Sequence, residues 1–127
     1  MNDQAAPSAT GLDFVSVQVR SLEAARQFYV DRVGFLPASE SPQGALVFQA
    51  QAGATFAVRT PLVDLEAVPH LGWGVSLWFA HTDVEALCAR LIAYQVPVLR
   101  PLADGPFGRM FTCADPDGYA ITFHQQG

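Results

Sequence analysis

Charged side chains are scarce in this sequence of 127 residues, at 15% of the chain, whereas half of the chain is hydrophobic. A chain of this length and composition can form the core of one compact domain without disulfides. With so few charges, much of its surface must be neutral or apolar. We therefore expect an apolar pocket or an oligomer interface, and we predict a homodimer.

Basic residues are particularly few, with seven arginines and lysines against twelve acidic residues and a formal net charge of −5. A polyphosphate backbone would repel such a surface, so nucleic-acid binding is excluded as a function. A negative charge balance suits cationic or neutral small ligands instead. A small organic molecule is the partner that this composition favours.

Cysteines and long apolar runs are also rare. Cys88 and Cys113 have neither C-x-x-C nor zinc-site spacing, and we interpret both as buried small apolar residues. No apolar stretch is long enough to span a bilayer. The first ten residues, MNDQAAPSAT, lack the basic start and apolar stretch of a secretory leader. We expect residues 1–10 to form a flexible tail on a cytoplasmic protein that has no membrane partner.

The order of the expected elements occurs twice along the chain. One helix follows Ser21 and ends at Gly34, and a second is capped by Thr82 or Asp83. Residues 61–72 form a linker, and residues 101–108 a Pro/Gly loop. Strands are predicted over 12–19, 44–49, 55–60, 74–79, 96–99, 109–113 and 119–124.

The two halves align without a gap, since FVSVQVRSLEA matches SLWFAHTDVEA at an offset of 62 residues. Each half would contain one helix and about four strands. One half alone would leave a sheet face bare, so two must pair. The pattern predicts an α+β fold of two modules, residues 11–60 and 73–126.

Two segments resemble the vicinal-oxygen-chelate superfamily, the glyoxalase/bleomycin-resistance protein/dioxygenase type. They are S-L-E-A-A-R-Q-F-Y-V-D-R-V-G-F at residues 21–35 and G-P-F-G-R-M-F-T-C-A-D-P-D-G-Y-A-I-T-F at residues 105–123. The resemblance covers residues 11–126 as a single domain. It implies two βαβββ modules that form a half-open sheet around a cavity. The D-P-D-G turn has a structural explanation, because its aspartates can accept hydrogen bonds from nearby backbone N–H groups, and we assign it no catalysis.

Metal-dependent members of this superfamily have His, Glu or Gln ligands at four recurring points. The resemblance aligns these points with Phe14, Ala57, Ser76 and Thr122, and none of the four is a histidine or a carboxylate. Phe14 and Ala57 cannot bind a metal, and the hydroxyls of Ser76 and Thr122 are weak neutral donors. We therefore predict no metal site and no cofactor. This departure argues against glyoxalase, extradiol dioxygenase and metal-dependent fosfomycin chemistry.

The predicted cavity faces contain small residues, hydroxyls, aromatic rings and one cation, which together suit an organic ligand. The resemblance also implies that a loop near Phe107 closes over the pocket. The predicted ligand-binding residues are Phe14, Ser16, Gln18, Arg59, Ser76, Trp78, Phe107, Arg109, Thr122 and His124. Trp78 either stacks on a ring or a cation or packs in the core, and Arg59 either reaches solvent or meets a ligand anion. His124 could exchange a proton near neutral pH, whereas His70 and His81 lie in loops.

Three functions remain open on these grounds. The first is a metal-independent binding protein that sequesters an aromatic or cationic organic ligand, as the bleomycin-resistance branch does. The second is an enzyme of the same superfamily, lyase- or dioxygenase-like, with an atypical or absent metal site. The third is a structural or regulatory domain. The sequence shows no Ser–His–Asp set, phosphate loop or paired carboxylates, so we predict the first.

Overall fold

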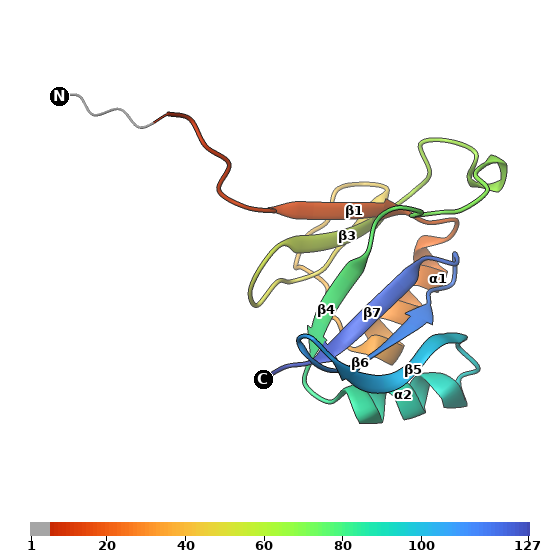
Figure 1. The fold of residues 1–127 in the computed structure, drawn as a ribbon. Coiled ribbons are helices and arrows are strands. Elements are labelled where there is room, and N and C mark those ends of the chain that lie inside the picture. The colour runs from red at the N-terminus through yellow and green to blue at the C-terminus, as the bar shows by residue number, and fades with distance from the viewer. Residues whose placement is uncertain (1–5) are drawn as a thin grey trace.

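A computed structural model describes residues 6–127 of the chain. The first five residues of the predicted tail lie outside the described residues, and residues 6–10 are exposed without regular secondary structure. Figure 1 shows two sheets turned toward the viewer, with the helices behind them. No helix in the described chain is long and apolar enough to cross a membrane.

The first module contains a three-stranded sheet in the order β1-β3-β2. β1 (Phe14–Gln18) runs parallel to β3 (Thr55–Arg59), and β2 (Ala45–Val47) is antiparallel to β3. A single bridge between Pro37 and Phe48 stands in place of a further strand. With that bridge, the module has the βαβββ order that the sequence predicts.

The helix of the first module begins and ends at the predicted residues. Ser21 accepts a hydrogen bond from the backbone N–H of Ala24 and so caps α1 (Leu22–Arg26). The helix continues as a π-helical segment, η1 (Gln27–Val33), and ends at Gly34, whose φ is 103°. This is the left-handed conformation that glycine adopts readily at the end of a helix.

The second module has a four-stranded sheet in the order β4-β7-β6-β5. β4 (Leu77–His81) is parallel to β7 (Ala120–Gln125), and the other two pairs are antiparallel. The middle of the module is formed by α2 (Val84–Ala93), β5 (Val98–Gly105) and β6 (Gly108–Ala114). The linker contains one short 3-10 helix, η2 (Leu65–Ala67).

The two helix caps show the internal repeat directly. Asp83 caps α2 by accepting a hydrogen bond from the N–H of Ala86, as Ser21 does for Ala24. The two caps are 62 residues apart, which is the offset between the aligned halves of the sequence. The fold is α+β, and its two sheets do not close into a barrel, so the predicted class and half-open arrangement are confirmed.

Two predicted boundaries in the second module were wrong. The strand expected over 74–79 begins only at Leu77, because Gly72 and Gly74 hold the preceding chain in positive-φ turns. The Pro/Gly loop expected over 101–108 is mostly strand, because β5 continues to Gly105. β5 is an edge strand with two register shifts, and an edge strand tolerates Pro101, which has no N–H to donate.

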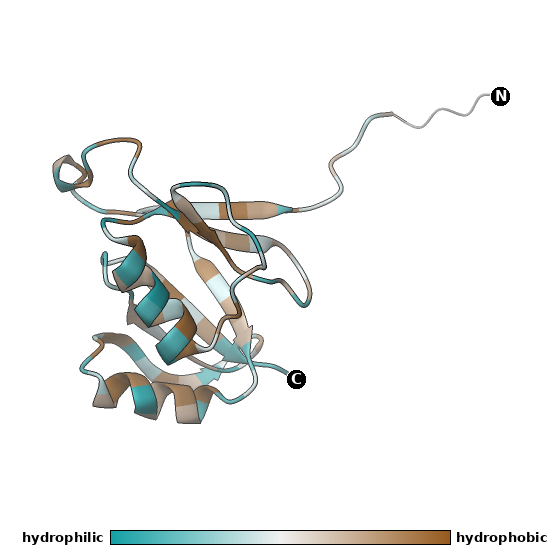
Figure 2. Cartoon of the chain, turned by 180° about the vertical axis from the view of Figure 1, so that it is seen from behind, coloured by the Kyte–Doolittle hydropathy of each residue, from teal (hydrophilic) through white to brown (hydrophobic). Residues whose placement is uncertain are grey.

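One hydrophobic core serves both modules. The helices pack behind the sheets, and Figure 2 shows their polar positions on the outer side. The large side chains of this core come from both halves of the chain. They include Phe28, Tyr29, Phe48, Phe56, Leu91, Phe111, Ile121 and Phe123.

The D-P-D-G turn connects the second module to the first. Asp115 accepts hydrogen bonds from the backbone N–H groups of Asp117 and Tyr119, so the predicted local bonding is confirmed for this residue. Its other oxygen accepts a hydrogen bond of 2.7 Å from the hydroxyl of Tyr29 in η1. Asp117 instead accepts from the backbone and guanidinium of Arg20, beyond the end of β1.

Candidate ligand-binding face

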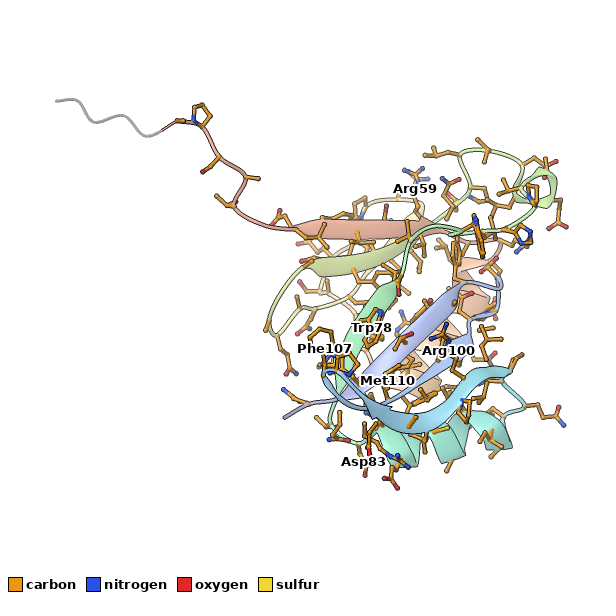
Figure 3. The ribbon with its side chains drawn as sticks, in the orientation of Figure 1. Arg59, Trp78, Asp83, Arg100, Phe107 and Met110 are labelled. Atoms are coloured by element: carbon orange, nitrogen blue, oxygen red, sulfur yellow. The ribbon has the colours of Figure 1, made fainter. Side chains whose placement is uncertain are left out.

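One face of the second sheet is turned away from the helices, and we call it the open face. In β7, Ile121 and Phe123 are fully buried in the core, so the alternation of the strand places Thr122 and His124 on the other side. The open face is the side of β4, β7, β6 and β5 that carries these two residues. Figure 3 shows its side chains toward the viewer.

Strand register arranges the open face in rows that cross all four strands. Trp78 pairs with Thr122, Thr122 with Thr112, and Thr112 with Arg100. In the next row, the residues that pair across the four strands are Ala80, His124, Met110 and Ala103. Trp78 and Arg100 therefore stand at opposite edges of the same row, with two short threonines between them.

Three rings gather at one end of this face, and we call them the aromatic cluster: Trp78, Phe107 and His124. The ring centroids of Trp78 and Phe107 are 5.8 Å apart and nearly perpendicular. His124 lies 6.0 Å from Phe107 and 6.5 Å from Trp78. Phe107 is 65% exposed and Trp78 38% exposed, so both present apolar surface to solvent. The indole N–H of Trp78 donates to Ser76 Oγ at 2.7 Å, which fixes the ring orientation.

The aromatic cluster includes a polar atom without a partner. Nδ1 of His124 is buried and has no hydrogen-bond partner among the residues that the structure describes. A buried polar atom in this state costs about 1–3 kcal/mol. The neighbouring hydroxyls of Thr112 and Thr122 are bonded to each other at 2.7 Å. His124 therefore has an unused hydrogen-bonding atom, which is buried in this structure.

The hairpin that carries Phe107 depends on two glycines. Gly108 has a φ of 110°, which the tight turn requires. A Cβ on Gly105 would lie 2.2 Å from the sulfur of Met110, so a larger residue there would force the Met110 side chain to move. The two residues between these glycines, Pro106 and Phe107, form the tip that holds the phenyl ring beside Trp78.

The structure brings together five of the ten residues predicted to bind ligand. Phe107 and Ser76 contact Trp78, Thr122 stands beside Trp78 in the sheet, and His124 completes the aromatic cluster. The four predicted residues of β1 and β3 lie on the other sheet. They are Phe14, Ser16, Gln18 and Arg59.

Two residues of that second group have local contacts. The side-chain oxygen of Gln18 accepts from the N–H of Leu62 at 2.6 Å, and Arg59 donates to the carbonyl of Thr60. Figure 3 shows Arg59 far from Trp78 and Phe107. Phe14, in contrast, is 50% exposed on an edge strand.

Arg109 lies on the helix side of its sheet rather than on the open face. Its guanidinium is 3.6 Å from Glu85 of α2 and 3.5 Å from Asp104. Sequence reasoning missed Met110 and Arg100, which occupy the open face instead. Strand alternation back from Thr112 was the available signal for Met110. Arg100 lies between the predicted strand over 96–99 and the predicted loop over 101–108, so it was assigned to neither.

The four points aligned with metal ligands do not fit a metal. Ala57 is buried and has no donor, and Phe14 has none either. Ser76 Oγ is engaged by Trp78, and Thr122 Oγ1 by Thr112. Within residues 6–127, no three side chains of His, Cys, Asp or Glu come close enough to hold a metal ion. Burial raises the pKa of the Cys113 thiol to about 12, which keeps it from acting as a thiolate ligand or nucleophile.

A separate cavity of about 410 Å³ lies in the gap between the two modules. Its wall includes Phe35, Phe56 and Phe79, which also pack against one another, and none of the ten predicted residues lines it. His81 at its edge is structural: Nδ1 accepts from the N–H of Asp83, so Nε2 carries the proton and donates to the carbonyl of Val33.

Paired modules with one shared core and an open sheet face define the α+β fold class of this chain. The sequence matches the Glyoxalase/Bleomycin resistance protein/Dioxygenase superfamily over residues 11–123. The chain therefore belongs to this superfamily. A comparison with curated protein sequences finds no significant match.

Solved structures of the same class are similar over nearly the whole chain. TnmS3, an antibiotic binding protein from Streptomyces sp. CB03234, is 28% identical with a TM-score of 0.70, covering 96% of this chain and all of TnmS3. A glyoxalase/bleomycin resistance protein from the same Streptomyces strain is 31% identical, with a TM-score of 0.67, covering 91% of this chain and all of that one. A glyoxalase/dioxygenase from Nostoc punctiforme, 15% identical with a TM-score of 0.75, shares the fold over 100% of this chain and 99% of its own.

Proposed function

We propose that this protein binds a small aromatic organic molecule on the aromatic cluster and does so without a metal. The observation that carries the proposal is the set of exposed rings of Trp78 and Phe107 around the partnerless Nδ1 of His124. Pockets for organic ligands combine apolar walls with a few oriented polar atoms. The similarity to TnmS3, described as an antibiotic binding protein, supports this function.

Each residue of the aromatic cluster has a distinct part in this proposal. The indole of Trp78, fixed by Ser76, gives a flat surface on which a ligand ring can stack. Phe107 contacts the indole at a right angle and would border the ligand from the hairpin tip. Nδ1 of His124, which is buried in this structure, would form a hydrogen bond with a polar group of the ligand once the exposed ring of Phe107 moves aside. The paired threonines lie between Trp78 and Arg100 in the same row of the sheet.

Titration with naphthamide, a neutral two-ring aromatic, tests the proposed site directly. The chain has two tryptophans, so proton–nitrogen NMR spectra contain two indole signals that a Trp73→Ala variant assigns. We expect the Trp78 signal to shift on titration. Shifts confined to residues around Phe56 and Phe79 would locate binding in the cavity between the modules and contradict the proposal.

We also propose that two copies of the chain form a homodimer that completes the site. β1 and β4 stand at open edges of their sheets, and unpaired edges are surfaces on which further strands or chains pack. Large apolar side chains are exposed on β1 and in the turns that precede β4, among them Phe14, Trp73 and Val75. A second copy that covers these side chains would bring Phe14 and Ser16 of β1 toward an aromatic cluster.

Sedimentation measures the association state. At micromolar concentration we expect a species of twice the 13.7 kDa chain mass, because contacts that bury such apolar edges persist in dilute solution. A Val75→Glu substitution, which places a charge at the exposed edge, should shift the population toward monomer. A wild-type protein that sediments only as a monomer would contradict the dimer.

Metal removal should change neither stability nor binding. The four aligned positions supply two hydroxyls, each already bonded, and no carboxylate or imidazole. We expect the melting temperature and the affinity for naphthamide to be the same before and after treatment with EDTA. A fall in melting temperature that one divalent metal restores would overturn the metal-independent function.

The partnerless Nδ1 of His124 also favours a second candidate, an enzyme in which this imidazole exchanges a proton with the substrate. The two candidates differ in what happens to the bound molecule. A binding protein releases its ligand with unchanged mass, whereas an enzyme releases a product. Mass spectrometry of small molecules incubated with wild-type and His124→Gln protein distinguishes them, because only an enzyme would convert them in a His124-dependent way.

The cysteines bear on where the protein acts. Cys88 and Cys113 are both free and buried. Unpaired thiols are typical of proteins from reducing compartments. We therefore propose a cytoplasmic protein whose partners are a small organic ligand and a second copy of itself.

A further inference from the structure

The open face carries a positive charge although the protein as a whole is acidic. Arg100 is exposed there and forms no ion pair with any residue from 6 to 127. The second module has five carboxylates, and all lie in α2 and its cap, in the D-P-D-G turn, or on the helix side of β5. They are Asp83, Glu85, Asp104, Asp115 and Asp117.

The row of paired residues from Trp78 to Arg100 sets the distance between the indole surface of Trp78 and the guanidinium charge of Arg100. Trp78 and Arg100 are separated by three strand-to-strand steps. Each step is about 4.8 Å, so their backbones are about 14 Å apart. Figure 3 shows the Arg100 side chain on the same face as Trp78, Met110 and Phe107. The two functional groups would thus hold opposite ends of one extended molecule.

The local charge decides what kind of molecule fits. At physiological salt, interactions between exposed charges that are more than about 8–10 Å apart are largely screened. The acidic groups behind the sheet therefore have little effect on a ligand in front of it. A guanidinium binds a carboxylate through two parallel hydrogen bonds. A cationic ligand, which the net charge of −5 suggests, would instead meet Arg100 as a like charge.

Building on the proposed function, we propose that the ligand is an extended aromatic acid. Its two or three rings lie against Trp78 and Phe107, and its carboxylate is held by Arg100. The paired hydroxyls of Thr112 and Thr122 lie beneath the middle of the molecule. Arg100 thereby determines which aromatic compounds the protein selects.

Three probes of equal ring size and different charge test this selection. They are naphthoate, naphthamide and naphthylmethylammonium, with affinities measured by calorimetry at physiological salt and Trp78 followed by NMR. We expect naphthoate to bind about threefold to tenfold more tightly than naphthamide, and the cation most weakly, since a partly exposed charge pair contributes modestly. Added salt should reduce the preference for naphthoate.

Two variants with the same loss of charge isolate the role of Arg100. Arg100→Gln should remove the preference for naphthoate over naphthamide. Arg90→Gln, which removes an exposed arginine of α2, should keep the preference. Equal binding of the three probes, or tightest binding of the cation, would overturn the aromatic acid while leaving the aromatic site intact. A Trp78 signal that none of the probes shifts would overturn both.

Discussion

Replacing Trp78 by alanine is expected to weaken binding of naphthamide about tenfold to a hundredfold. The indole would contribute about 0.5–1.5 kcal/mol through ring–ring contact in addition to the apolar area it removes from water. A total of about 1.5–3 kcal/mol corresponds to that change in affinity. Calorimetric titration of the wild type and the Trp78→Ala variant measures it.

The same substitution should leave the chain folded. Trp78 is 38% exposed and lies on the face opposite the core, so the cost of about 3–5 kcal/mol for truncating a core aromatic does not apply in full. Thermal melting of the variant checks this. A variant that unfolds would show that Trp78 is a core residue rather than a binding residue.

Trp73→Ala is the matched control. Trp73 is 85% exposed, and its ring contacts His70 in the linker rather than the aromatic cluster. Its replacement should leave the affinity for naphthamide unchanged, whereas Trp78→Ala reduces it. A folded Trp78→Ala variant with wild-type affinity would place the ligand elsewhere on the molecule.

Local signals in the sequence were sufficient for the helices and the repeat. Ser21 and Asp83 act on backbone groups only three residues away, so their effect can be predicted without knowing the fold. Gly34 ends the first helix for an equally local reason, its positive φ. The two-module fold could be predicted because the helix signals recur at the same offset of 62 residues.

Which residues lie on the open face depends on how the strands pair, and local sequence does not specify that pairing. Pro101 and the surrounding glycines suggested a loop, whereas the edge position of β5 allows a strand there. Because the predicted strand stopped at Leu99, Arg100 was left out of it, and the alternation of β6 was left unassigned. Arg109 was therefore expected at the pocket, although its strand turns it toward α2. The register shifts in β5 decide which residue stands opposite Thr112, and no local pattern predicts them.

The largest expected effect on stability comes from Asp115→Ala in the D-P-D-G turn. This carboxylate accepts three hydrogen bonds, from the hydroxyl of Tyr29 at 2.7 Å and from the N–H groups of Asp117 and Tyr119 at 2.9 Å each. Alanine leaves these donors without their partner, and each buried donor left unsatisfied costs about 1–3 kcal/mol. We expect a loss of about 3–5 kcal/mol in the free energy of unfolding, measured by denaturant titration.

Two milder variants separate the local hydrogen bonds from the link between the modules. Asp115→Asn keeps an oxygen for the two N–H groups and should cost far less than alanine. Tyr29→Phe removes only the bond between η1 and the turn, and should cost about 1.5–3 kcal/mol because the bond involves a charged group. If asparagine destabilised the protein as much as alanine, the hydrogen bonds would not be the cause.

The pH dependence gives an independent check on Asp115. Burial raises the pKa of its carboxyl above the ordinary 3.8, although hydrogen bonds from Tyr29 and the turn oppose the shift. A raised pKa in the folded state means that protonation favours folding; this contribution is complete below about pH 3.8 and is lost as pH rises through the folded pKa. The wild type should therefore gain stability relative to Asp115→Asn on acidification. Removing the Tyr29 hydroxyl raises the pKa further, so Tyr29→Phe should cost less at acidic than at neutral pH. A cost that is equal at both pH values would contradict a charged carboxylate as the acceptor.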